Sequence, residues 1–158
     1  MKSATVKELK QELGVRSHGE LLELCLHLSK FKKENKELLT YLLYEAADEP
    51  TYIESVKTEV AQQFKLINTS SYYYIKKSVR KILRTIKKYI RYSKKKETEV
   101  ELLLYFCSQL KQMSPPMEKS IALHNIYKRQ VEAIKKAIAT LHEDLQYDYE
   151  SELEELIF

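Results

Sequence analysis

An imidazole and three carboxylates lie close together near the carboxyl-terminal end of the sequence: His142, Glu143, Asp144 and Asp148. Such groups are ligands for zinc and other transition metals. Successive residues on a helix diverge by about 100°, however, so three neighbours in a row cannot point at one ion. The sequence also lacks an HExxH motif and has no Glu three residues before a His. We therefore predict no metal site and no bound cofactor.

Nucleophilic catalysis has equally little support. Cys25 and Cys107 each lie among leucines and form neither a CxxC nor a CxxxH pair. None of the four histidines has a local signature that links it to a cysteine. Buried free thiols in a reducing compartment are the expected state. We predict no catalytic residues and a protein that is not an enzyme.

A long segment of positive charge is the most informative feature of the sequence. Residues 60–96 contain twelve Lys and Arg and no Asp or Glu. The whole chain of 158 residues has 27 basic and 23 acidic side chains, so the rest is net negative, with 15 basic against 23 acidic. Residues 143–158 hold seven of those acids and no Lys or Arg. The net charge of +4 therefore conceals a strongly polarised molecule.

A helix over about residues 71–92 would place this charge on one side. At 3.6 residues per turn, ten basic residues fall within an arc of roughly 140°. They are Lys76, Lys77, Arg80, Lys81, Arg84, Lys87, Lys88, Arg91, Lys94 and Lys95. Tyr73 falls within the same arc, whereas the aliphatic side chains gather opposite it. Burial of the aliphatic side would force the basic side outward.

Ten like charges on one side of a helix repel one another, and each i,i+4 pair costs a few tenths of a kcal/mol. Phosphates of a nucleic acid would offset that cost, with arginines binding them bidentately and Tyr73 stacking on an unpaired base. An acidic protein, the chain's own acidic segments or an anionic lipid surface would also do so. We predict nucleic acid as the partner, RNA or DNA with low specificity, and an acidic protein as the alternative. A membrane is disfavoured because the apolar side of the helix is needed for the core.

The sequence predicts helices for all of the elements that would position this basic surface. Only two Gly and three Pro occur, and apolar residues recur at helical spacing throughout. We predict an all-α fold: a single compact domain of about six or seven antiparallel helices over residues 1–147, as an irregular bundle or a short helical-repeat-like array. Residues 148–158 would form an acidic tail, either frayed or docked on a hydrophobic groove. The tail could also contact another subunit, and a homo-oligomer is compatible with the sequence.

Capping residues and prolines give the expected helix boundaries. Ser3 or Thr5 would cap a first helix, and Ser17 with Glu20 forms a capping-box pattern for a second. Pro116 is well placed for the first turn of the last long helix. The expected helices cover residues 5–13, 18–31 with a bend at 32–36 and a resumption to 46, 50–68, 71–92, 97–113 and 116–147. The helix over 97–113 is the most apolar and is expected to be the most buried.

The segment 29–41 has a weak sequence similarity to the segment 64 positions later. Its residues Ser29, Lys30, Lys32, Glu37, Leu38, Leu39 and Tyr41 recur at 93, 94, 96, 101, 102, 103 and 105. An old duplication of a helix pair would produce this pattern. Chance alignment of two amphipathic helices would also produce it, because Lys, Glu and Leu are common in this chain.

The amino-terminal sequence has no apolar region typical of a secretory signal, and no apolar stretch approaches the roughly 20 residues that span a bilayer. These features predict a cytoplasmic protein.

The segments KENKELLTYLLYEA, INTSSYYYIKKSVRKILRTIKKYIRYS and LHEDLQYDY resemble a small bacterial all-helical family of unknown function. The likeness covers nearly the whole chain. It implies a cytoplasmic helical domain but brings no activity, ligand or site residue. VKELKQEL and GELLEL near the amino terminus are similar to a SAP-type DNA-binding helix pair, but the basic Arg-Gly-Leu turn and the Gly-x-Lys pair of that family are missing. We carry no residue over from it.

Overall fold

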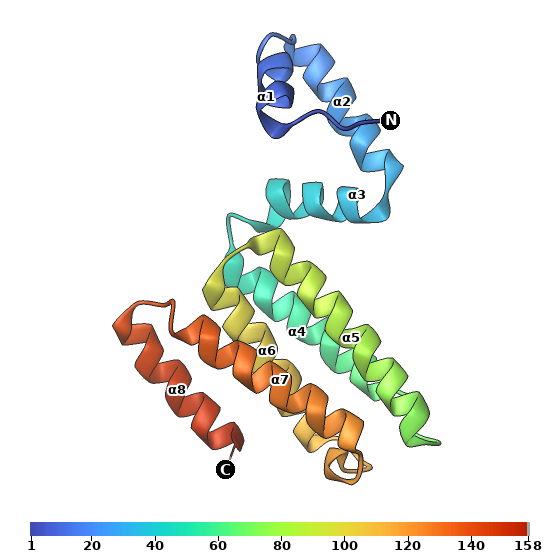
Figure 1. The fold of residues 1–158 in the computed structure, drawn as a ribbon, viewed down its shortest axis with the longest axis vertical. Helices are drawn as coiled ribbons and strands as arrows, with labels where there is room; N and C mark the ends of the chain where they lie inside the picture. Colours follow the sequence, from blue (N-terminus) through green and yellow to red (C-terminus); the bar gives the residue numbers. More distant parts are fainter. Residues whose placement is uncertain (158) are drawn as a thin grey trace. The chain divides into compact units, whose positions relative to one another are not determined.

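The computed structural model describes residues 1–157, and these form helices joined by short turns, without a strand in that range (Figure 1). The elements are α1 (Val6–Gly14), α2 (His18–Phe31), α3 (Lys33–Thr40), a π-helical turn (Tyr41–Glu45), α4 (Glu49–Lys65), α5 (Tyr72–Ser93), α6 (Lys96–Gln112), a 3₁₀ turn (Met117–Lys119), α7 (Ile121–Ile138) and α8 (Glu143–Ile157). The predicted all-α class is confirmed. The described residues form eight α-helices rather than six or seven.

The chain divides into two compact units, an N-terminal unit of residues 1–44 and a C-terminal unit of residues 45–158. The boundary expected at residue 147 falls inside α8.

In the N-terminal unit, local hydrogen bonds fix where the helices begin. Thr5 Oγ1 accepts from the backbone N–H of Glu8 at 3.3 Å, while the Glu8 carboxylate accepts from the Thr5 N–H at 2.7 Å. Ser17 and Glu20 make the same reciprocal pair at 3.2 and 3.1 Å. Thr5, not Ser3, is therefore the first cap, and the predicted capping box of Ser17 with Glu20 is confirmed. The bend expected at residues 32–36 is a full break, because Lys32 is extended between α2 and α3.

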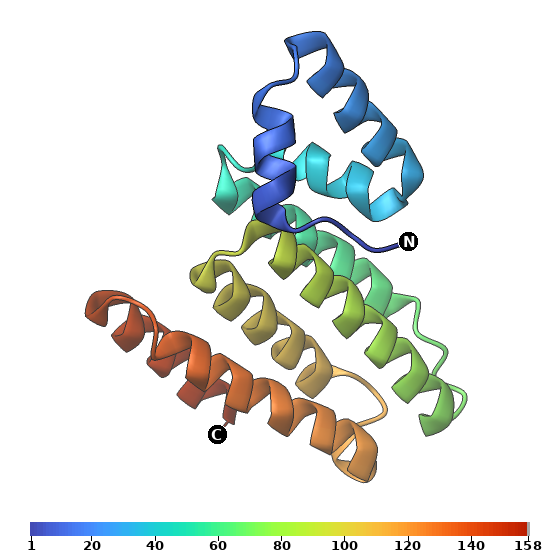
Figure 2. The same ribbon diagram turned by 45° about the horizontal axis from the view of Figure 1, so that its top comes forward.

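The C-terminal unit is built around α6. This helix packs against α4 and α5, against α7, and against α8, and it lies between the α4–α5 pair and α7 in both views (Figures 1 and 2). Only Lys96, Glu97 and Gln112 of α6 are exposed, and Val100, Phe106 and others are fully enclosed. The prediction that this segment is the most buried element is confirmed.

Two boundary predictions near α7 are wrong. Pro116 precedes the 3₁₀ turn, and α7 begins only at Ile121, where Ser120 Oγ accepts from the backbone N–H of Leu123 at 3.4 Å. The helix predicted to continue to residue 147 ends at Ile138. The chain turns there, and the Gln146 side chain donates to the Leu141 carbonyl at 2.7 Å, which satisfies a backbone group left open by the turn.

The predicted seam of α7 is confirmed up to the turn, since Tyr127, Val131, Ile134 and Ile138 are all buried. Residues 148–157 belong to α8, which docks on α6 and α7 and buries Tyr149 and Leu153. The docked alternative for the acidic segment is therefore the one observed. The acidic side chains lie mainly on the outer side of α8, because the two buried residues are spaced four apart on the inner side.

No helix within residues 1–157 is both long enough and apolar enough to cross a lipid bilayer.

Candidate functional site

The helix α5 presents two opposite sides, as the charge pattern predicts. Its inner side buries Ile75, Val79, Ile82 and Ile86, none more than 3% exposed, against α4 and α6. Ser71 caps the helix with its Oγ 3.5 Å from the backbone nitrogen of Tyr74. The packed inner side fixes the rotation of the helix about its axis, so the outer side is held toward solvent.

The ten basic residues predicted from the sequence lie on this outer side or just beyond its end; we call the ten together the basic face. Eight of them are exposed: Lys77, Arg80, Lys81, Arg84, Lys87, Arg91, Lys94 and Lys95. Lys76 and Lys88 are half-buried. The structure therefore brings the predicted set together along the whole length of α5.

The basic face is not neutralised by the chain itself. Among the described residues, no ion pair involves Lys76, Lys77, Arg80, Lys81, Arg84, Lys87, Arg91 or Lys94. The acidic α8 packs on α6 and α7 instead. Internal neutralisation, one of the alternatives open from the sequence, is therefore absent for these eight residues.

Lys95 differs from the other members because it has a structural partner. Its Nζ lies 3.5 Å from Oε2 of Glu49, at the start of α4. The same Glu49 carboxylate accepts hydrogen bonds from Thr98 Oγ1 at 2.6 Å and from Ser93 Oγ. Lys95 thus belongs to a cluster that ties α4 to the α5–α6 turn, and its charge is partly used within the fold.

Lys94 has the one positive φ among the described residues, with φ 59° and ψ 5°. This left-handed conformation caps the carboxyl end of α5, where its backbone N–H donates to the Ile90 carbonyl at 2.9 Å. Glycine is the usual residue there, and a side chain costs about 1 kcal/mol. A positive charge near the negative end of the helix dipole offsets part of that cost.

The first turns of α5 carry aromatic rings beside the charge. Tyr73 is 63% exposed and Tyr74 is 46% exposed, and their rings meet edge to face with centroids 5.3 Å apart. Lys76 Nζ lies 5.8 Å from the Tyr73 ring centre, a cation–π distance. Tyr72 is instead held in place by a hydrogen bond, which its hydroxyl donates to the Pro116 carbonyl at 2.8 Å. Tyr73 is therefore the most exposed ring at this end of the basic face.

A shallow, open depression of 540 Å³ follows the basic face over about four turns of the helix. Its lining residues are Tyr73, Lys76, Lys77, Arg80, Leu83, Arg84 and Lys87. Six of the seven were predicted as site residues. Leu83 is the addition, and it gives the depression an apolar floor between cations.

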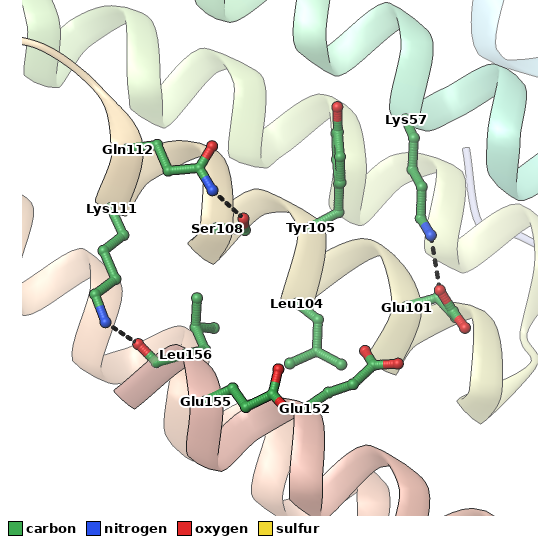
Figure 3. A pocket seen from close by; sticks show the side chains of 10 residues that line it. All are labelled: Lys57, Glu101, Leu104, Tyr105, Ser108, Lys111, Gln112, Glu152, Glu155 and Leu156. Carbon is green, nitrogen blue, oxygen red and sulfur yellow. Dashed lines mark hydrogen bonds and ion pairs between the residues drawn. The ribbon is translucent and has the colours of Figure 1, made fainter. Parts of the chain in front are cut away.

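A second hollow, of 680 Å³, lies between α4, α6 and α8, and sequence reasoning missed it (Figure 3). At one end Lys57 Nζ donates to Oε2 of Glu101 at 2.8 Å; at the other, Lys111 Nζ donates to the Leu156 carbonyl. No local motif signals it, because its residues come from three helices. The Lys57 cation and the Glu101 carboxylate satisfy each other, which is typical of a structural cluster.

The electrostatics of this hollow follow from burial. Burial acts to lower the pKa of Lys57, but its hydrogen bond and charge interaction with Glu101 outweigh this, so the pKa is raised. Burial, together with the Glu101 charge, raises the pKa of Glu152. The pattern indicates a cluster of carboxylates close to the Lys57 ammonium group.

The cysteines and the possible metal ligands can be placed in the fold. Within residues 1–157, no group of three His, Cys, Asp or Glu side chains is placed to hold a metal ion. Cys107 is fully enclosed, and burial raises the pKa of its thiol to about 12, so this cysteine is inert. Cys25, expected to be buried, is exposed. The leucines beside Cys25 in the sequence therefore do not mark a buried position.

Neither a protein-family model, nor a curated protein, nor a solved structure matches this chain. The resemblance to a small bacterial helical family therefore stays a prediction.

Proposed function

We propose that this protein binds nucleic acid, RNA or DNA, through the basic face of α5 and with low sequence specificity. The observation that carries the proposal is that eight basic side chains lie along one helix without an ion pair to any described residue. A polyanion with regularly spaced phosphates relieves their mutual repulsion and releases its own counterions.

The composition of the basic face supports phosphate contacts rather than base reading. Arg80, Arg84 and Arg91 can bind phosphate oxygens with two parallel hydrogen bonds each, and the lysines add point charges. α5 is also packed on two neighbouring helices along its inner side, so only its outer arc is available. Contacts of this kind position a nucleic acid but do not read its sequence.

An acidic protein is the alternative partner, and Leu83 favours it. This half-buried leucine lies among cations on the floor of the depression. An acidic helix could place one apolar side chain there and its carboxylates on the surrounding lysines and arginines.

The test is binding of fluorescent single-stranded RNA, single-stranded DNA and duplex DNA, measured by anisotropy across a salt series. With five to eight phosphate contacts, the affinity should fall with salt at a log–log slope between about −4 and −7. The variant Arg80→Glu, Arg84→Glu, Lys87→Glu and Arg91→Glu should bind at least about 100-fold more weakly at low salt and keep its circular dichroism spectrum.

A matched control separates the basic face from net charge. Lys128, Arg129, Lys135 and Lys136 are exposed on α7, and changing all four to Glu alters the charge by the same amount. The control should retain most of the affinity. Equal losses in both variants, or binding that survives reversal of the basic face, would contradict the proposal. Absence of binding by all three nucleic acids at low salt would favour the acidic protein.

A further inference from the structure

The N-terminal unit has well-formed helices but almost no core. It contains eleven leucines within residues 1–44, and none of them is buried; Tyr41 is the one buried apolar residue described in this unit. Helices of this length are marginal in water unless their apolar sides are packed. We therefore expect the exposed leucines of this unit to pack against another protein surface.

The α2–α3 pair presents an apolar surface to which another helix layer could bind. The two helices pack against each other, and the Asn35 side chain donates to the Leu28 carbonyl at 2.8 Å, which fixes the turn between them. A groove of 220 Å³ runs along the pair. It is lined by Cys25, Leu28, Ser29, Asn35, Leu38, Leu39 and Leu42.

The C-terminal unit shows what covers a pair of this pattern. The internal sequence similarity aligns Leu38 and Leu39 with Leu102 and Leu103. These two residues of α6 are 1% and 2% exposed, because further helices pack around α6. Leu38 is 36% exposed, and Leu39 is half-buried. The aligned serines, Ser29 and Ser93, are both buried near the ends of their helices. The α2–α3 pair thus has the apolar pattern of a helix pair that accepts another helix layer.

The charge of the N-terminal unit indicates what that layer is. Residues 1–44 contain eight basic and six acidic side chains, so the unit is nearly neutral, unlike the basic face. A strongly charged partner has no complementary surface here. Nearly balanced, interspersed charges suit pairing with an identical surface, in which each basic residue can meet an acidic one across a two-fold axis.

The available area is sufficient for a stable dimer. Nine large apolar side chains on α2, α3 and the π-helical turn that follows are at least 36% exposed. Together they offer apolar surface on the order of the 800 Å² that one partner contributes to a standard interface. A unit of this size is also close to the length below which oligomerisation is usually needed for a stable core.

We propose that the N-terminal unit is a self-association surface, in which the α2–α3 pair of one chain packs against the same pair of a second copy. This inference does not depend on the proposed nucleic-acid binding.

Sedimentation velocity of the full chain tests it directly. The wild-type protein should sediment at twice the 18.7 kDa of one chain at concentrations of about 10–100 µM, as expected for a micromolar or tighter Kd. The variant Leu28→Glu with Leu42→Glu should be monomeric with an unchanged circular dichroism spectrum. Ile121→Glu, which changes an 83% exposed residue of α7, should remain dimeric. A monomeric wild type, or a control that dissociates like the variant, would overturn the proposal.

A second readout requires no destabilising substitution. Cys25 lies in the groove and is exposed in the single chain, whereas Cys107 is buried. The rate of Cys25 labelling by a maleimide should therefore fall as the protein concentration rises through the dimer Kd. A dimeric mass with a labelling rate that does not depend on concentration would place the interface elsewhere and would also overturn the proposal.

Discussion

The hydroxyl group of Tyr149 on α8 lies 2.9 Å from Oε1 of Glu101 on α6, and Oε2 of the same carboxylate accepts from Lys57 on α4 at 2.8 Å. The Tyr149 hydroxyl also lies 3.0 Å from Oε1 of Glu97. One buried tyrosine thus fastens the acidic C-terminal helix to the central helix. Two carboxylates of α6 compete for its single proton.

Replacing Tyr149 by Phe should lower the free energy of unfolding by about 1–2 kcal/mol at neutral pH, because a hydrogen bond to a charged group is lost from a buried site. Urea denaturation followed by circular dichroism measures this change. Tyr147 is 77% exposed on the same helix, so Tyr147→Phe is a matched control that should have little effect. Equal effects of the two substitutions would contradict the assigned role.

The Tyr149 effect should also depend on pH. Burial, followed by the hydrogen bond to Glu101, raises the pKa of Tyr149 well above its usual value near 10. In the unfolded chain the hydroxyl loses its proton above about pH 10, while in the folded protein it keeps it. The stabilisation is therefore fully present below pH 10 and is lost as pH rises further. The difference between wild type and Tyr149→Phe should shrink between neutral pH and about pH 11.

Lys94 allows stability and binding to be separated. Lys94→Gly should raise the free energy of unfolding by about 0.5 kcal/mol, since glycine adopts the left-handed conformation without strain. It should also weaken nucleic-acid binding and reduce the salt slope by about 1. Lys94→Ala removes the same charge but keeps the β-carbon, so it should weaken binding equally without the gain in stability. Thermal denaturation and anisotropy report the two effects; a stabilised Ala variant would refute the strain argument.

Tyr73 should distinguish single strands from duplexes. An exposed ring beside cations can stack on an unpaired base, and such stacking contributes about 1–3 kcal/mol per base. Tyr73→Ala should therefore weaken binding of single-stranded RNA by roughly tenfold or more and leave duplex DNA affinity nearly unchanged. Tyr147→Ala removes an exposed ring from α8 and should change neither affinity. An equal loss for both polymers would assign Tyr73 a structural role instead.

The features that the sequence predicts well are local ones. The reciprocal pairs of Thr5 with Glu8 and of Ser17 with Glu20 involve residues three positions apart, so their spacing is visible without a fold. The basic face is equally accessible to prediction, because a strongly amphipathic helix has one rotation that buries its isoleucines.

The features that the sequence predicts poorly depend on what packs against a helix. Leu141 and Leu145 continue the apolar spacing of α7, yet α7 ends at Ile138 and the following helix buries Tyr149 and Leu153 instead. Cys25 lies among leucines just as Cys107 does, but only Cys107 is covered by other elements of the fold. Periodicity shows that a side is apolar but does not show whether another element covers it.

The length of α5 sets the size of the surface available to a polymer. Its 22 residues span about 33 Å at 1.5 Å per residue, and one strand of a duplex advances about 3.4 Å per nucleotide. A nucleic acid bound along the basic face, as we propose, would therefore have about ten nucleotides beside it. Oligonucleotides shorter than this would lose phosphate contacts one after another, while longer ones would accommodate several copies side by side, each occluding a similar length of strand.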